Sequence, residues 1–151
     1  MQVSKTLAFL LSAFALCAVG FAIWKDFAAP KQPQSAPVAP RRIVVYYFHG
    51  DAHCSACDRM ESLGSRSVDD GFQDEINSGL VVWAPTNTDR KANEHYVSDY
   101  RLLTRSIVVA EFKDGKRKRW KNLDRVWDLL DDSKAFTTYV QDEVAAYVGA
   151  P

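Results

Sequence analysis

Residues 44–60 read VVYYFHGDAHCSACDRM. The stretch begins as a β-branched and aromatic run, which is typical of a strand that is covered on both faces of its sheet. Gly50 ends this run, and a helical pattern that opens with Cys54 and Cys57 follows it. Two cysteines with two residues between them can form a redox pair, hold a metal ion or be two buried thiols. The position of this pair, between a buried strand and a helix, favours the redox pair.

The composition indicates one ordinary globular domain behind a non-globular N-terminus. Of the 151 residues, 47% are hydrophobic and 25% are charged, and the formal net charge is zero. Residues 41–151 contain 16 Lys and Arg against 18 Asp and Glu, so they lack the basic excess that a nucleic-acid-binding domain carries. Three cysteines are too few for a disulfide-rich scaffold.

The first 27 residues are predicted to form a transmembrane anchor. Residues 6–24 contain no charge, and a helix of this length just spans a hydrocarbon core of about 30 Å. Two alternatives stay open for this segment. It can be a cleaved signal sequence, or it can carry a lipid at Cys17, although the bulky Leu16 before that cysteine disfavours lipidation.

A linker and a single domain follow the anchor. Residues 28–40 contain four prolines and are expected to form a semi-rigid tether, and residues 41–151 form the domain. The positive charges around the span favour a cytoplasmic domain. Thiol–disulfide chemistry instead favours the extracytoplasmic, periplasmic side of the cytoplasmic membrane. The sequence alone leaves this conflict open.

The domain reads as strand–helix–strand–helix–strand–strand–helix. The first three strands, which are linked through helices, are expected to be parallel, and the Asp114-Gly115 turn predicts an antiparallel hairpin. The last helix is expected to begin at an N-cap, Ser133, and to end at Gly149. The expected elements are strands at 43–48, 80–84, 107–112 and 117–123, one or two helices over 54–76, and helices at 91–103, 123–130 and 133–149.

This order, with C-x-x-C at the junction of an early strand and the helix after it, resembles the thioredoxin fold over about residues 41–149. The resemblance implies an α/β domain with a central mixed four-stranded sheet and flanking helices.

A narrower likeness involves YYFHG at 46–50, the C-x-x-C pair, Asn87-Thr88-Asp89, SIVV at 106–109 and RWKNLDRVW at 119–127. These segments resemble the ArsF family, a small group of membrane-tethered thioredoxin-like proteins described as a subunit of nitrophenyl compound nitroreductase and linked to organoarsenical resistance. That likeness implies delivery of electrons, as thiols, to an aromatic nitro or arsenical reduction system.

The two cysteines are expected to differ in role. At the first turn of a helix, the unpaired backbone N–H groups and the helix dipole stabilise a thiolate. Cys54 is therefore predicted to be the exposed attacking thiolate, and Cys57, one turn further and more buried, to be the resolving thiol. These roles predict a thiol–disulfide oxidoreductase that works as a reductase and needs no cofactor beyond this redox-active disulfide. It does need an integral-membrane dithiol as electron donor and a substrate protein as acceptor.

Two features depart from the thioredoxin pattern. Ser106 stands where that fold places a cis-proline, and a cis bond to a residue other than proline costs about 2.5–4 kcal/mol, so a trans bond is predicted. Thioredoxins also bury a carboxylate in the strand before the cysteines, and this strand has none. His49, Asp51 and His53 are the nearby groups that can assist proton transfer, and a charged His53 would lower the pKa of Cys54.

Metal binding is the alternative function. Cys54, Cys57 and His53 provide two thiolates and an imidazole, which suit copper(I), zinc or a trivalent arsenical. Against this reading, a closed zinc site normally draws its ligands from two separated pairs.

Trp83, Trp120 and Trp127 lie within apolar periodicity and are expected in the core. The basic run Lys116–Lys121 is expected to be a solvated edge.

Overall fold

The computed structural model describes residues 40–52 and 54–150. The predicted anchor over residues 1–27 and nearly all of the linker lie outside this part of the chain. Among the residues that are described, no helix has both the length and the apolar character needed to cross a bilayer.

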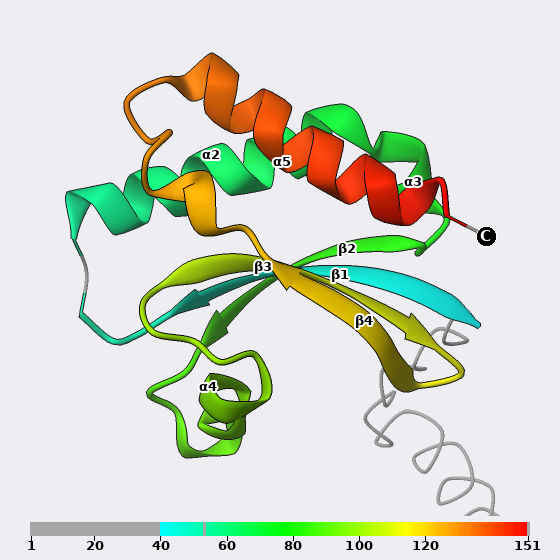
Figure 1. Cartoon of the computed structure of the whole chain (residues 1–151), viewed down its shortest axis with the longest axis horizontal. Helices are drawn as coiled ribbons and strands as arrows, with labels where there is room; N and C mark the ends of the chain where they lie inside the picture. The colour runs from blue at the N-terminus through cyan, green and yellow to red at the C-terminus, as the bar shows by residue number, and fades with distance from the viewer. Residues whose placement is uncertain (1–39, 53, 151) are drawn as a thin grey trace, which may run out of the picture. The chain divides into compact units, whose positions relative to one another are not determined.

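Four strands form one sheet in the order β2-β1-β3-β4 (Figure 1). The strands are β1 (Arg41–His49), β2 (Val81–Asn87), β3 (Ser106–Lys113) and β4 (Lys116–Asn122). β1 pairs in parallel with β2 and antiparallel with β3, and β3 pairs antiparallel with β4. The sheet is therefore mixed, as predicted, and β1 lies inside it.

Helices cover both faces of this sheet (Figure 1). One face carries α2 (Ser55–Gly71), α3 (Gln73–Asn77) and the C-terminal α5 (Ser133–Val148). The other face carries α4 (His95–Asp99), which the 3-10 turn η1 (Lys91–Asn93) precedes. A second 3-10 turn, η2 (Asp124–Val126), connects β4 to α5.

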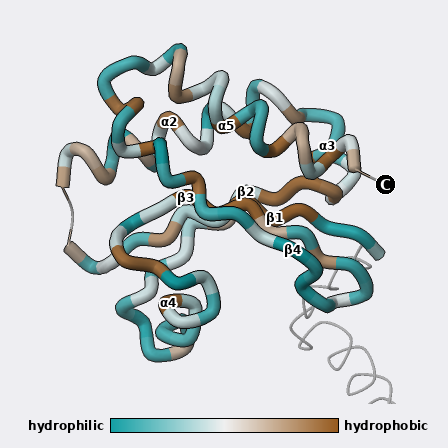
Figure 2. Tube along the Cα trace, viewed as in Figure 1, coloured by the Kyte–Doolittle hydropathy of each residue, from teal (hydrophilic) through white to brown (hydrophobic). Residues whose placement is uncertain are grey.

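The run Ile43–Phe48 within β1 has no charged residue because it is covered on both faces of the sheet. Ile43, Val45 and Tyr47 belong to the larger core cluster, which lies under α2 and α5. Phe48 belongs to a second cluster with Tyr100, and Tyr46 packs against that cluster on the α4 side. Figure 2 shows the hydrophobic run along the central strands. Alternating side chains of this run thus pack into two cores, which is why no charged residue interrupts it.

The expectation that the first three strands are parallel is wrong for β3. β2 ends at Asn87, which pairs with His49, and β3 begins at Ser106, which pairs with Phe48. The chain therefore leaves β2 and enters β3 at the same end of the sheet, where β1 also ends. A parallel crossover must return along the whole sheet, usually through a long helix. The connection that contains the short α4 does not return along the sheet, so β3 runs antiparallel to β1.

The predicted helix over residues 91–103 is also wrong in its extent. Only η1 and α4 form there, and Leu103, the last residue of the predicted helix, is fully exposed. A helical pattern over so few residues does not distinguish one short turn from a full helix.

Four local predictions are confirmed, and one is corrected. The helical region after the cysteines forms two pieces, α2 and α3, and the last helix ends at Gly149. Asp114 and Gly115 turn the β3–β4 hairpin with φ angles of 54° and 72°. The basic strand β4 is an exposed edge. The N-cap of α5 is Asp132 rather than Ser133, because the Asp132 carboxylate accepts a hydrogen bond from the Ala135 N–H at 3.0 Å.

A buried carboxylate joins three strands to the C-terminus of α5. Glu111 of β3 is 4% exposed and accepts hydrogen bonds from Arg41 of β1 at 2.6 Å and Arg119 of β4 at 2.8 Å. Arg41 also donates to the last carbonyls of α5, those of Tyr147 and Val148. Burial alone would raise the pKa of Glu111, but the hydrogen bonds and charges of the two arginines outweigh it and hold the pKa below its usual value.

Candidate redox site

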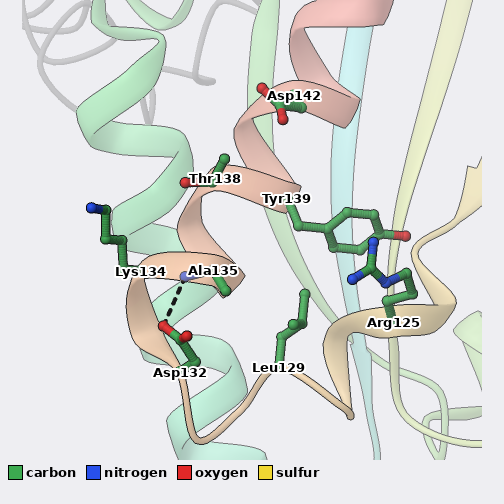
Figure 3. Close-up of a pocket in the computed structure, with 8 residues that line it drawn as sticks. All are labelled: Arg125, Leu129, Asp132, Lys134, Ala135, Thr138, Tyr139 and Asp142. Atoms are coloured by element: carbon green, nitrogen blue, oxygen red, sulfur yellow. Dashed lines mark hydrogen bonds between the residues drawn. The ribbon is translucent and has the colours of Figure 1, made fainter.

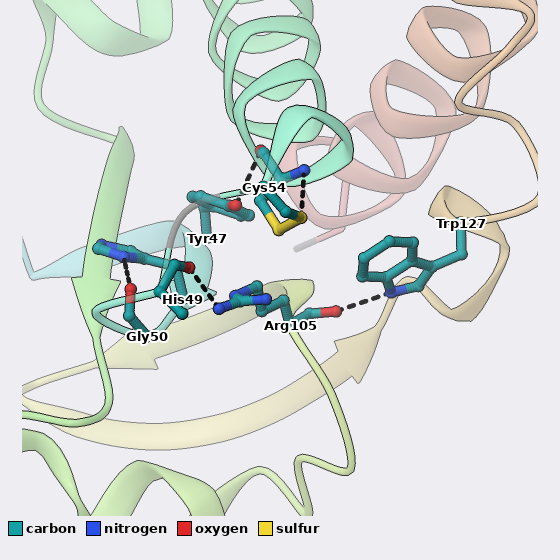
Figure 4. Close-up of a disulfide and its surroundings, with 8 residues drawn as sticks. Tyr47, His49, Gly50, Cys54, Arg105 and Trp127 are labelled. Carbon is teal, nitrogen blue, oxygen red and sulfur yellow. Dashed lines mark hydrogen bonds between the residues drawn. A yellow bond between two sulfur atoms is a disulfide. The ribbon is translucent and has the colours of Figure 1, made fainter.

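Cys54 and Cys57 form a disulfide at the start of α2, with their Cα atoms 5.1 Å apart (Figure 4). Cys54 is the N-cap residue of this helix, and its sulfur accepts a hydrogen bond from the backbone N–H of Cys57 at 3.2 Å. Cys54 is exposed, whereas Cys57 is only 4% exposed. An incoming group can therefore reach the first sulfur, and the second lies behind it.

Tyr47 lies beneath this first turn. Its hydroxyl donates a hydrogen bond of 2.9 Å to the carbonyl of Cys57, and the residue is 1% exposed. Burial, together with the nearby charges of Glu61 and Asp58, raises the pKa of Tyr47 to about 12, and the charge of Arg105 partly opposes this rise. Tyr47 is therefore a neutral donor at physiological pH. The sequence identified the strand that lacks an acid, but not this tyrosine as the residue beneath the cysteines.

Arg105 and Trp127 connect the loop before β3 to both sides of the disulfide. The Arg105 guanidinium donates to the carbonyl of Ala52, two residues before Cys54. The indole N–H of Trp127 donates to the carbonyl of Arg105 at 2.8 Å (Figure 4). Trp127 packs against the core, as expected, and also borders the redox turn, because it lines a depression of about 320 Å³ with Ser55.

Ser106 follows Arg105 directly and opens β3. The described residues contain no cis peptide bond, so the predicted trans bond at Ser106 is confirmed. Ser106 is 4% exposed, and its hydroxyl donates to the carbonyl of Thr104 at 3.1 Å. Its side chain is therefore occupied within its own loop.

Two of the three nearby acid–base candidates make other contacts in the structure. Asp51 is exposed; it accepts a hydrogen bond from Asn87 at 2.7 Å and forms an ion pair with Arg90 at 3.6 Å. His49 stacks on Tyr47 with ring centroids 5.6 Å apart, and its Nδ1 lies 3.0 Å from the Gly50 carbonyl. His53 lies outside the described residues, so its predicted role stays a prediction.

No group of three potential metal ligands occurs among the residues that the structure places. The proposed soft-metal set of Cys54, Cys57 and His53 includes one residue that is not among them, so the metal reading stays untested.

Two further depressions lie on the surface of the domain. One, of about 340 Å³, adjoins the redox loop and is lined by Phe48, His49, Gly50, Thr88, Asp89, Val97, Leu102, Leu103, Thr104 and Arg105. Another, of about 400 Å³, has mixed charges and shares no residue with the disulfide site (Figure 3). Its lining consists of Arg125, Leu129, Asp132, Lys134, Ala135, Thr138, Tyr139 and Asp142. Only the first of these two depressions includes residues that touch the loop before Cys54.

The described domain has an α/β thioredoxin-like fold. Its order of elements, mixed four-stranded sheet and disulfide at the start of α2 carry this assignment. No protein-family model and no curated protein matches the sequence. Among solved structures, the chain is similar to the X-ray structure of Fasciola hepatica thioredoxin, with 17% identity over 65% of this chain and 81% of that one and a TM-score of 0.34. None of these comparisons supports the narrower resemblance to the ArsF family.

Removing the Tyr47 hydroxyl is expected to weaken the oxidised protein. The Tyr47→Phe variant loses a buried hydrogen bond to the redox turn, which predicts a loss of about 1 kcal/mol in the free energy of unfolding. Denaturant unfolding at pH 7 measures it. Tyr139→Phe is the matched control, because its hydroxyl makes an exposed hydrogen bond of 3.3 Å to Asp124 and should cost much less. Equal losses in both variants would contradict this role of Tyr47.

Proposed function

We propose that this protein is a thiol–disulfide oxidoreductase that acts through Cys54 and Cys57. One observation carries the proposal. The sulfur of Cys54 is exposed at the N-cap of a 17-residue helix, and it is bonded to a buried sulfur one turn further along. In the reduced state, the same N-terminus would stabilise a thiolate on Cys54 through the helix dipole and the Cys57 N–H.

The reaction in the reductive direction has two exchange steps. The Cys54 thiolate attacks one sulfur of a substrate disulfide, forms a mixed disulfide and displaces the other substrate sulfur as a thiolate, which takes a proton from solvent. Cys57 then loses its proton and attacks the Cys54 sulfur, which restores the Cys54–Cys57 disulfide and releases the second substrate thiol. Two electrons move from the cysteine pair to the substrate, and two protons accompany them.

The proton of Cys57 needs an acceptor, and the phenol beneath it is a poor one. With a pKa raised to about 12, Tyr47 does not act as a base near neutral pH. Asp51 is engaged by Asn87 and Arg90. We therefore assign this role to a histidine of the preceding loop, His53 or His49, with solvent as the final acceptor.

The wider setting is part of the same proposal. The uncharged segment at residues 6–24 supports a membrane anchor, and a reductase on the oxidising side of a membrane requires an integral-membrane dithiol donor. The segments quoted above that resemble the ArsF family support an aromatic nitro or arsenical reduction system as the final electron acceptor.

The decisive test is catalysis by the full-length protein in detergent. We expect it to accelerate the reduction of a peptide disulfide by dithiothreitol, and Cys17→Ser, which leaves the C-x-x-C pair intact, to match the wild type. Equilibration with glutathione buffers gives the direction, because a reduction potential of about −270 mV marks a reductant and one of about −120 mV an oxidant. No acceleration, together with stoichiometric copper or zinc in protein purified under reducing conditions, would support the metal-binding alternative instead.

A further inference from the structure

Arg105 occupies a position that the proposed chemistry does not yet use. Its guanidinium donates to the carbonyl of Ala52, in the loop that leads directly to Cys54. Figure 4 shows the Arg105 side chain extended beneath the disulfide in this view, from the start of β3 toward that loop. The side chain is only half-buried, so the guanidinium keeps contact with solvent.

Both ends of this residue are held in place. The carbonyl of Arg105 accepts the hydrogen bond from the Trp127 indole at 2.8 Å, while the guanidinium holds the Ala52 carbonyl. Trp127 in turn packs against the core and lines the depression beside Ser55 and Ala56, in the first turn of α2. A guanidinium that is already held by a hydrogen bond, on a residue whose backbone is also held, loses little entropy when it interacts with a nearby anion.

The charges around the redox turn are otherwise mostly acidic. Asp58 and Glu61 of α2 lie close enough to raise the pKa of Tyr47, and Arg105 acts on the same phenol in the opposite sense. Arg59 on the outer side of the turn forms an exposed ion pair with Asp131 at 3.5 Å. Among the charged groups that shift the pKa of the buried Tyr47, Arg105 is therefore the cation.

We propose that Arg105 is the permanent positive charge that stabilises the reduced form of the cysteine pair, by favouring the thiolate of Cys54 from the loop before β3. It is a positioning residue: it shapes the loop through Ala52 and supplies charge, and it forms no bond to substrate. The proposal deepens the thiol–disulfide function proposed above and rests on it.

The sign of the effect follows from which state carries the charge. The disulfide is neutral and the reduced pair carries the thiolate, so a nearby cation stabilises the reduced form and raises the reduction potential. Removing the cation should therefore make the protein more reducing and raise the pKa of Cys54. A guanidinium stays charged at all physiological pH values, whereas a histidine loses its charge near pH 6.5, so Arg105 and His53 predict different pH profiles.

The test compares Arg105→Met and Arg105→Lys with Arg66→Met in the full-length protein. Arg66 is an exposed arginine further along α2 whose guanidinium donates hydrogen bonds to Ser62 of the same helix, so it controls for the loss of one charge. Equilibration with glutathione gives the reduction potential, and the rate of iodoacetamide alkylation from pH 4 to 9 gives the pKa of Cys54. Thermal unfolding of the oxidised forms detects a purely structural effect.

We expect Arg105→Met to shift the equilibrium about tenfold toward the oxidised form, which corresponds to about 30 mV, and to slow alkylation at pH 6 by a similar factor. Arg105→Lys should recover most of both effects, and Arg66→Met should match the wild type. Unchanged potential and alkylation in Arg105→Met would overturn the proposal, as would a lysine variant as impaired as the methionine variant. Neither readout requires turnover, so a wild type that titrates normally but catalyses no exchange would count against the proposed function alone.

Discussion

Replacing Cys54 with serine is expected to reduce catalysed disulfide reduction to the background rate, a loss of at least about two orders of magnitude. A serine hydroxyl does not ionise near neutral pH and cannot attack a disulfide. Cys57→Ser should behave differently, because the exposed Cys54 still carries out the first step. Without the buried partner, the mixed disulfide has no resolving group and should accumulate.

Mass spectrometry under non-reducing conditions separates these two outcomes. After incubation with a peptide disulfide, Cys57→Ser should carry the mass of one peptide, and Cys54→Ser should carry none. Both variants are compared with Cys17→Ser, which removes the third cysteine of the chain and leaves the C-x-x-C pair intact. If Cys54→Ser traps the peptide and Cys57→Ser does not, the assigned roles are reversed. If both variants retain full turnover, the C-x-x-C pair is not the site.

The sequence predicted those parts of the fold that short-range patterns determine. The apolar run of β1, the Asp114-Gly115 turn and the basic edge strand β4 all depend on neighbours within a few residues. The strand polarity of β3 was missed for the opposite reason. It depends on where the chain between β2 and β3 travels, and the sequence of that connection does not show whether its helix returns along the sheet.

The candidate site was predictable only along one segment of the chain. Cys54 and Cys57 are three residues apart, and both their disulfide and their difference in exposure could be inferred from a helix start. Arg105 donates a hydrogen bond to Ala52, which is 53 residues earlier in the chain. Trp127, in turn, donates to the carbonyl of Arg105, which is 22 residues before it. No short-range pattern links either residue to the cysteines, so only the packed structure brings them to the disulfide.

The same limit applies to Glu111, whose surroundings no local pattern reveals. It was expected only as one position of an apolar strand, yet it lies buried between Arg41 and Arg119, with 70 residues separating it from the first. Because Arg41 also holds the final carbonyls of α5, this one carboxylate connects the sheet with the end of the last helix. Removing one partner of a buried ion pair leaves uncompensated charge, which is strongly destabilising.

We expect Glu111→Gln to lower the free energy of unfolding at pH 7 by about 2–3 kcal/mol, below the range for fully buried pairs because the two arginines are partly exposed. The folded pKa of Glu111 is lowered, so its stabilising contribution is present above the unfolded value, near 4.5, and is lost as the pH falls through the folded value. The difference between wild type and variant should therefore shrink below about pH 4.5.

Denaturant unfolding between pH 3 and 8 measures this difference, and Glu143→Gln provides the control, since Glu143 makes an ion pair of 2.6 Å with the more exposed Lys121. That pair should contribute less than about 1 kcal/mol. A difference for Glu111→Gln that is no larger than the control, or that does not change between pH 7 and pH 3, would show that the buried carboxylate does not hold α5 to the sheet through its charge.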